Sequence, residues 1–321
     1  MSARVVLAGI DEAGLGPLLG SLAIGYALLE APEGAEPWKR LRPTVAKTPS
    51  KRARVVVGDS KVVFQRTARG ARRLEETVLA FHALAAGALV PSPEAFLFGA
   101  LAPPAEFRAL PWRAELPPLP ADCAAETLEL TLDVLARALA KAELAVLDCG
   151  VRLVPAAELN ASYAETHNKA DSVWVRVVEV LRHAWRQRTR GAVLATVDML
   201  GGRRRYGSQL ARALPEASVT LVEECEGRSA YRLVARDGSG RMELEFRVKG
   251  ESHSFAVALA SCCAKYAREL EMRAFNAYFT RWQPELVPTA GYRQDGNRWL
   301  AEAGVALERS GVARGVLVRE R

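Results

Sequence analysis

Cysteine, histidine and long apolar stretches are scarce in this sequence, and each scarcity argues against a class of protein. Five cysteines are scattered over 321 residues without a C-x-x-C pair, and the adjacent Cys262 and Cys263 offer poor geometry for zinc. An odd and sparse set of cysteines fits a reducing compartment, so we expect a cytoplasmic protein. No apolar run reaches the roughly 18 residues of a membrane helix, and we see no secretory signal.

Two familiar enzyme motifs are also missing. No histidine pair has the spacing of zinc ligands, and no G-x-x-x-x-G-K-[ST] sequence occurs, which disfavours a P-loop NTPase. What the chain does have is basic charge: 44 lysines and arginines against 37 acidic residues give a net charge of +7. The basic residues cluster at 51–54, 66–73, 182–190 and 203–205. Arginine binds phosphate in a bidentate manner, so this charge favours a nucleic-acid partner, with an ordinary solvated basic surface as the alternative.

The hydrophobic pattern predicts alternating strands and helices. We expect strands at 4–10, 21–29, 144–147, 151–154, 192–197 and 219–222, and helices at 65–86, 123–142, 169–187, 204–213 and 254–280. A hairpin is expected at 230–249, around the turn formed by Asp237-Gly238-Ser239-Gly240. The stretch 31–54 is expected to be an exposed loop, and the proline-rich stretch 89–121 an irregular insertion. This alternation indicates an α/β fold with a mixed sheet.

The most informative segment is 8–20, where an apolar run ends in two adjacent carboxylates, Asp11 and Glu12, and a glycine-rich turn follows. A buried strand does not normally end in this way unless a cation compensates the charges. The glycines leave room for a large ligand to approach the backbone. A metal ion and a phosphate-containing polymer suit both halves of the segment, and a solvated strand-to-turn junction is the alternative.

Carboxylates recur at the ends of other apolar segments, namely Asp59, Asp148, Asp198 and Glu251. Several acidic side chains at one edge of a sheet would form an oxygen cage of the kind that Mg²⁺ prefers. Two such ions can hold the attacking water and the leaving oxygen of a phosphodiester. We expect Asp148 to lie outside this site, as a strand cap or as the partner of an arginine.

Six segments, in order along the chain, resemble motifs of the type 2 ribonuclease H family (prokaryotic ribonucleases HII and HIII and the catalytic subunit of eukaryotic ribonuclease H2). They are Asp11-Glu12-Ala13-Gly14-Leu15-Gly16-Pro17, Asp59-Ser60-Lys61, residues 154–160, Val197-Asp198-Met199-Leu200-Gly201 with Tyr206, Lys249-Gly250-Glu251 followed by residues 258–269, and Thr289-Ala290-Gly291-Tyr292-Arg293-Gln294-Asp295. The stretches 31–54, 88–140 and 226–247 have no counterpart in these motifs.

The resemblance implies a ribonuclease H-like α/β fold, with a mixed central sheet flanked by helices, with insertions and with a C-terminal helical segment. It implies a catalytic domain over 1–280, which holds an irregular or helical insertion at about 88–140 and a hairpin insertion at about 226–247. Residues 281–321 are then expected to form a C-terminal segment that contacts the substrate.

The resemblance also implies the site. Its catalytic residues, which are also the ligands of Mg²⁺ or Mn²⁺, would be Asp11, Glu12, Asp198 and Glu251. Its substrate-binding residues would be Gly14, Leu15, Gly16, Ser60, Lys61 and Tyr292. Tyr292 would stack under the sugar at an RNA–DNA junction, with a core or rim aromatic as the alternative. Ser60 and Lys61 would contact a phosphate, with helix capping by Asp59 or Ser60 as the alternative.

The activity implied is metal-dependent endonucleolytic hydrolysis of RNA in RNA–DNA hybrids, or of ribonucleotides embedded in DNA, through two metal ions. Two departures from the family pattern motivate an alternative. Leu15 stands where the family has arginine, and Glu251 stands where the family usually has aspartate. The alternative is a protein that binds hybrids but has weakened or lost catalysis. The nucleic acid is the expected partner; the sequence names no protein partner and indicates no membrane association.

Overall fold

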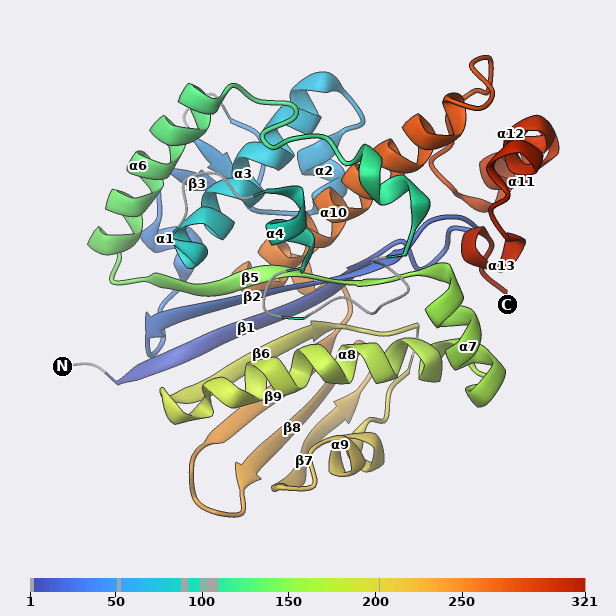
Figure 1. Cartoon of the computed structure of the whole chain (residues 1–321). Coiled ribbons are helices and arrows are strands. Elements are labelled where there is room, and N and C mark those ends of the chain that lie inside the picture. The colour runs from blue at the N-terminus through green and yellow to red at the C-terminus, as the bar shows by residue number, and fades with distance from the viewer. Residues whose placement is uncertain are drawn as a thin grey trace.

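A seven-stranded mixed sheet runs through the protein and carries helices on both faces (Figure 1). The computed structural model describes residues 3–50, 53–87, 92–98, 101, 109–201 and 203–320. The strands, in their order across the sheet, are β5 (Ala145–Val154), β2 (Leu22–Pro32), β1 (Arg4–Ala13), β6 (Ala192–Asp198), β9 (Arg241–Arg247), β8 (Arg228–Ala235) and β7 (Ala217–Cys225). Strands β1, β6 and β9 run parallel to one another, and the other neighbouring pairs are antiparallel.

The remaining elements surround this sheet and form one small separate sheet. The helices are α1 (Pro37–Arg40), α2 (Ser60–Phe64), α3 (Ala68–Ala86), α4 (Pro93–Phe98), α6 (Ala125–Lys141), α7 (Ala156–Thr166), α8 (Lys169–Arg186), α9 (Gly207–Ala213), α10 (Phe255–Thr280), α11 (Arg293–Glu302), α12 (Gly304–Ser310) and α13 (Arg314–Leu317). The 3-10 turns are η1 (Pro111–Glu115), η2 (Gln187–Thr189) and η3 (Gly250–Ser252), and the small sheet consists of β3 (Val45–Ala46) and β4 (Val55–Val56).

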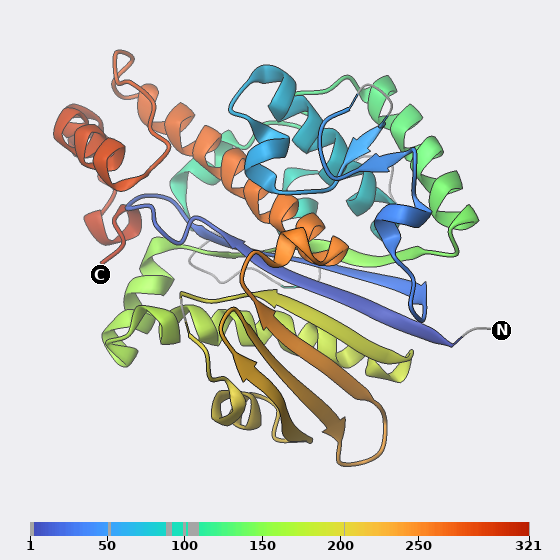
Figure 2. The same cartoon turned by 180° about the vertical axis from the view of Figure 1, so that it is seen from behind.

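Strand β1 is apolar on both faces and therefore belongs to two cores. Val5 and Leu7 pack into the core under α3, α6 and α10, whereas Val6, Ala8 and Ile10 pack into the core under α8. Such a continuous apolar run is typical of a strand covered by helices on both sides. Figure 2 shows, from behind, how α10 crosses one face of the sheet while α8 lies on the other.

Helix α10 lies unusually close to the sheet because two glycines face it. A Cβ atom built at Gly9 would lie 2.0 Å from the carbonyl carbon of Ala256, and one at Gly25 would lie 2.0 Å from the carbonyl oxygen of Ala260. The small residues at the start of α10 thus meet strands without side chains at these points. This close contact fixes the helix beside the ends of β1 and β6.

The predicted mixed α/β sheet with flanking helices and a C-terminal helical segment is confirmed, as are the strand at 192–197 and the long helix at 254–280. The stretch 31–54 is not simply a loop, because it contains α1 and β3. The stretches 144–147 and 151–154 belong to one strand, β5. Strand β2 offers it a continuous row of partners, and a register shift near Asp148 accommodates one extra residue.

The segments without counterparts in the family motifs are built as follows. In the stretch 88–140, the described residues form α4, η1 and α6; residues 88–91, 99–100 and 102–108 lie outside the described part of the chain. The stretch 226–247 forms β8 and β9, and β9 pairs with β6, so this hairpin continues the central sheet. Among the described helices, none combines the length and the hydropathy required to cross a membrane.

Candidate active site

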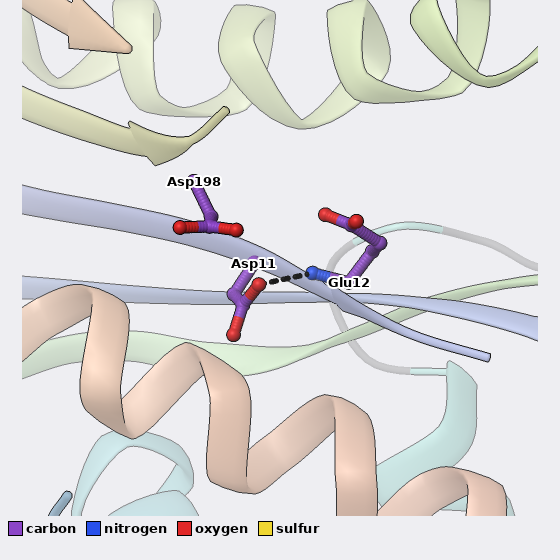
Figure 3. Close-up of side chains that lie close together, drawn as sticks. All are labelled: Asp11, Glu12 and Asp198. Carbon is purple, nitrogen blue, oxygen red and sulfur yellow. Dashed lines mark hydrogen bonds between the residues drawn. The ribbon is translucent and has the colours of Figure 1, made fainter. Parts of the chain in front are cut away.

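Two parallel strands bring three carboxylates together. Ile10 of β1 is in register with Val197 of β6, so the next residue on each strand, Asp11 and Asp198, lies at the same place along the sheet. Ligand atoms of Asp11, Glu12 and Asp198 all lie within 4.8 Å of one another (Figure 3). The apolar runs that precede both aspartates are what bury the two strands and place their ends at one edge of the core.

The charges of these three side chains oppose one another in a site that is largely withdrawn from water. Burial first, and then the charge of Asp198, raise the pKa of Asp11 to about 7. Burial and the charges of Asp11 and Asp198 raise the pKa of Glu12 to about 8. Burial also raises the pKa of Asp198. Each carboxylate is therefore costly to ionise until a cation compensates it.

Hydrogen bonds fix the orientation of Asp11 in spite of this repulsion. Its Oδ1 accepts a hydrogen bond of 2.8 Å from the main-chain N–H of Glu12, and hydrogen bonding to Ser261 of α10 also lowers its pKa. The hydroxyl oxygens of Ser261 and Ser60 lie 3.0 Å apart, within hydrogen-bond distance. Asp11 is thus held between its own strand and the helix that crosses it.

Glu251 lies in the same cleft but not in the group of three. It is part of η3 and lines a cleft of about 380 Å³ together with the three clustered carboxylates. Its charge raises the pKa of Asp11 and of Asp198, yet the group whose ligand atoms lie within 4.8 Å of one another, searched over the described residues, does not include it. The structure therefore brings three of the four predicted ligands together and places the fourth elsewhere in the lining of their cleft.

The start of α2 forms the wall of the cleft opposite the strands. Ser60 and Lys61 both line it. Asp59 is the N-cap of α2 and accepts a hydrogen bond of 2.9 Å from the N–H of Lys61, so the capping role belongs to Asp59 and not to Ser60. The charge of Lys61, whose side chain is exposed, lowers the pKa of Asp198. The cleft thus presents a cation and a hydroxyl to any ligand that enters it.

The glycine-rich turn after β1 is held from behind by two buried arginines. Arg268 of α10 donates to the carbonyl oxygens of Leu19, Ser21 and Ala290 at 2.8 to 3.2 Å. Arg319 donates to the carbonyl oxygens of Gly20 (2.7 Å) and Gly14. These contacts provide hydrogen-bond donors for the carbonyl oxygens on the inner side of the turn.

The three predicted binding residues of this turn lie in different surroundings. Gly14 has a φ of +88°, in the left-handed region, and a Cβ atom there would lie 2.8 Å from Cδ of Arg268. Gly16 faces open space, because a Cβ atom added to it would meet nothing within 4 Å. Leu15 is partly buried against the core on the α8 side of the sheet. The backbone at Gly16 is therefore accessible, whereas the Leu15 side chain packs inward.

Tyr292 lines a neighbouring cleft of about 540 Å³, not the carboxylate cleft. Its side chain is 43% exposed, so it is not a core residue. The Arg66 guanidinium lies 5.8 Å from its ring centroid. Lys265 lines the same cleft, forms an ion pair with Glu269 and lies 4.6 Å from the Phe64 ring centroid. Lys265 is thus paired within α10 and is not directed at the three carboxylates.

Sequence reasoning missed the supports of the site. Arg268 and Arg319 are distant from the turn in sequence, and no local signal in the last residues of the chain indicates that Arg319 reaches it.

Asp148 does not have the predicted arginine as its partner. Its carboxylate contacts His183 at 2.7 Å and Tyr26 at 3.5 Å and no arginine among the described residues. Its position opposite an imidazole follows from the packing of α8 on β5.

Comparison with known proteins gives a likeness of structure. No family model and no curated protein matches the chain. The chain is similar in structure to archaeal ribonuclease HII. One similar structure is the PCNA–RNase HII complex from Archaeoglobus fulgidus, with a TM-score of 0.44 and 15% identity over 98% of this chain and 94% of that chain. Another is the ribonuclease H2 from Pyrococcus horikoshii, with a TM-score of 0.43 and 16% identity over 97% and 92%.

At identities of 15% and 16%, this likeness concerns the fold alone.

Proposed function

We propose that this protein is a metal-dependent endoribonuclease that hydrolyses the RNA strand of RNA–DNA hybrids, ribonucleotides embedded in DNA, or both. The observation that carries the proposal is the convergence of Asp11, Glu12 and Asp198 within 4.8 Å at the ends of two parallel strands. Asp11 and Glu12 belong to the opening motif that resembles that of type 2 ribonucleases H. Asp198 belongs to the motif at residues 197–201.

The donor atoms suit Mg²⁺ or Mn²⁺. The group consists of carboxylate oxygens, which these hard cations prefer over histidine nitrogen or cysteine sulfur. The raised pKa values of Asp11 and Glu12 indicate negative charge in need of a counter-ion. Asp11, Glu12 and Asp198 would hold the cations, and Glu251 would complete their surroundings from η3. Bound divalent cations supply Lewis-acid stabilisation of the charge that develops on a phosphodiester during hydrolysis.

The residues around the carboxylates would bind and orient the nucleic acid. Ser60 and Lys61 offer a hydroxyl and a cation to a phosphate next to the cleavage point. The accessible backbone of the turn at Gly14 and Gly16 can approach the 2′-hydroxyl, the group that distinguishes RNA from DNA. Tyr292, exposed in the neighbouring cleft, offers an aromatic face to a sugar. Since basic residues supply the affinity, binding is expected to weaken as salt rises.

A cleavage assay over four substrates tests this proposal. The substrates are an RNA–DNA hybrid, a DNA duplex with one ribonucleotide, double-stranded RNA and DNA, each with Mg²⁺ or Mn²⁺. We expect cleavage of one or both of the first two, with 5′-phosphate and 3′-hydroxyl ends.

Asp11→Asn should reduce the rate at least about 100-fold, because the cation site loses one negatively charged ligand. The matched control, Asp133→Asn on the exposed face of α6, should cleave like the wild type. Equal cleavage by both variants would refute the assignment of the site.

A second candidate function is hybrid binding with weak or no catalysis. Its motivation is the position of Glu251 outside the group of three and the inward packing of Leu15. It predicts affinity for hybrids without turnover in either metal ion, and revival of cleavage by Glu251→Asp combined with Leu15→Arg. Cleavage by the wild-type protein at a rate that these two substitutions do not raise would exclude it.

A further inference from the structure

A second cleft borders the first turns of α3, along residues other than those that line the cleft of Tyr292. Four arginines line it, Arg54, Arg69, Arg72 and Arg73, and we call it the arginine cleft. Its volume is about 480 Å³. Arg69, Arg72 and Arg73 lie three and four positions apart in the first turns of α3, so they share one face of that helix. The only acidic residue among those described along the cleft wall is Glu76, which leaves an excess of positive charge.

The protein neutralises only part of this charge, because Arg54 pairs with Glu76 and Arg73 donates to the carbonyl oxygen of Val63 at 2.9 Å. Glu76 is already engaged, since it accepts a hydrogen bond of 2.8 Å from Thr131 and lies 3.6 Å from Arg54. Arg69 and Arg72 form no ion pair with any carboxylate in the part of the chain that the structure describes. Burial, and then the charge of Arg69, lower the pKa of Arg73. Like charges thus lie side by side along the α3 wall of the cleft.

The helix itself adds to the positive potential. Thr67 caps α3 with a 3.0 Å hydrogen bond from Gly70, and the first turn of the helix contains Arg69 but no acidic residue. Cations at a helix N-terminus oppose its dipole, so the charge of Arg69 is unfavourable there in the free protein. An anion bound in the arginine cleft would offset two unfavourable interactions. One is the repulsion among the arginines, and the other is the interaction of Arg69 with the positive end of the helix dipole.

The short helix α2 links the arginine cleft to the carboxylates. Ser60 and Lys61, at its start, line the carboxylate cleft, and Gln65, at its end, lines the arginine cleft. Gln65 and Arg66 both have positive φ values, 50° and 46°, a backbone conformation that non-glycine residues rarely adopt. This strained turn reverses the chain between α2 and α3, so that Arg66 enters the cleft of Tyr292 while the next arginines enter the other.

The packing of the turn is specific. A Cβ atom at Gly70 would lie only 1.4 Å from the carbonyl oxygen of Phe64, so α3 can approach α2 only because residue 70 is glycine. The packing of backbone on backbone therefore fixes the start of α3, which carries the arginines, relative to α2, which carries Lys61.

We propose that the arginine cleft binds the phosphodiester backbone of the same nucleic acid that enters the carboxylate cleft, at nucleotides away from the point of cleavage. The inference rests on the proposed function for the identity of the substrate. The open form of the cleft, its excess of arginine and its connection to the carboxylates through α2 favour a long polyanion over a small one. Guanidinium groups suit this role because they bind phosphate oxygens in pairs without reading a base.

Binding of a labelled RNA–DNA hybrid, measured by fluorescence anisotropy in EDTA over roughly 50–300 mM KCl, tests the inference through the salt slope. The variant is Arg69→Gln with Arg72→Gln. Its control is Arg212→Gln with Arg241→Gln, which removes the same charge from α9 and β9 on the opposite side of the molecule (Figure 1). Loss of two phosphate contacts should reduce the slope of log K against log salt by about 1.8, at 0.9 per contact. The control should change it by less than about half that amount.

Two further arms distinguish the outcomes. Arg69→Lys with Arg72→Lys should retain most of the slope because it retains the charge; a loss equal to that of the glutamine variant would overturn the inference. Inorganic phosphate at millimolar concentration should not compete with the hybrid; if it abolishes the difference between the variants, the cleft is a small-anion site and the inference is wrong. Cleavage by the wild type with identical slopes in all variants would refute this inference alone. Absence of cleavage with the expected slope change would refute the proposed function alone.

Discussion

The main-chain N–H of Gly250 donates a hydrogen bond of 2.8 Å to Oδ1 of Asp198. This contact joins residues that are distant in sequence, and it ties the turn carrying Glu251 to the end of β6. Asp198 therefore has two roles that can be separated. Its charge acts on the other carboxylates, and its Oδ1 accepts the hydrogen bond from Gly250.

Asparagine and alanine at position 198 should separate these properties. Asp198→Asn keeps an oxygen acceptor but removes the charge, so we expect unchanged or increased stability without metal and at least about tenfold weaker Mg²⁺ affinity. Asp198→Ala should in addition lose about 1–3 kcal/mol because the N–H of Gly250 is left unpaired. Calorimetric titration with Mg²⁺ and urea unfolding measure both effects. Identical stability of the two variants would show that the hydrogen bond contributes nothing.

Stability without divalent cations should fall as pH rises from about 5 to about 8. The pKa values of Asp11 and Glu12 are raised to about 7 and about 8 in the folded protein, so between pH 4 and 8 the folded state retains protons that the unfolded chain has released. Each unit corresponds to about 1.4 kcal/mol, and because the groups are coupled we expect a total loss on the order of 2–5 kcal/mol. Urea unfolding in EDTA at several pH values measures it, and added Mg²⁺ should restore stability at pH 8.

The control for this experiment is Asp11→Asn. The pKa of His82 is also raised, because hydrogen bonding to Cys149 outweighs burial, and it contributes a loss in the same direction in both proteins. The free energy of unfolding of this variant should therefore depend less on pH than that of the wild type, but it should still fall as pH rises. If its profile coincides with that of the wild type, the carboxylate group is not the source of the pH dependence.

Removal of the Arg268 side chain should disrupt the glycine-rich turn. Arg268 is 3% exposed and donates to three carbonyl oxygens, so Arg268→Leu leaves two buried acceptors and one partly buried acceptor unpaired and should cost at least about 3 kcal/mol. Arg273→Leu on the same helix is the control. Arg273 forms one partly exposed ion pair with Asp122, and its loss should cost at most about 1 kcal/mol. Equal thermal unfolding midpoints for the two variants would contradict the anchoring role.

The contact of α10 with the sheet predicts a glycine requirement. In Gly25→Ala the new methyl group would lie 2.0 Å from the carbonyl oxygen of Ala260, so the helix must move away and we expect a loss of about 3 kcal/mol or more. In Gly304→Ala the methyl group meets nothing within 4 Å, and the stability should change by less than about 1 kcal/mol. Urea unfolding compares them, and a tolerated alanine at position 25 would show that α10 can shift without loss.

The sequence by itself determined the elements and the candidate ligands. The apolar runs that end at Asp11 and Asp198 predicted buried strands, because only strands covered on both faces have such continuous hydrophobicity. The glycines after Asp11 predicted a turn, and within it Gly14 and Gly20 adopt positive φ values. Local hydrophobicity and backbone sterics act over a few residues, and for this reason they can be recognised in one chain.

Only the tertiary structure decided which of these groups meet. The parallel register of β1 with β6 brings Asp11 beside Asp198, whereas the path of η3 leaves Glu251 in their cleft but outside their group. The same holds for Arg319, which reaches the carbonyl oxygens of Gly14 and Gly20 from the far end of the chain. Contacts of this kind depend on how whole elements pack, and packing is set by the sum of many distant side chains. No motif of a few residues contains that information.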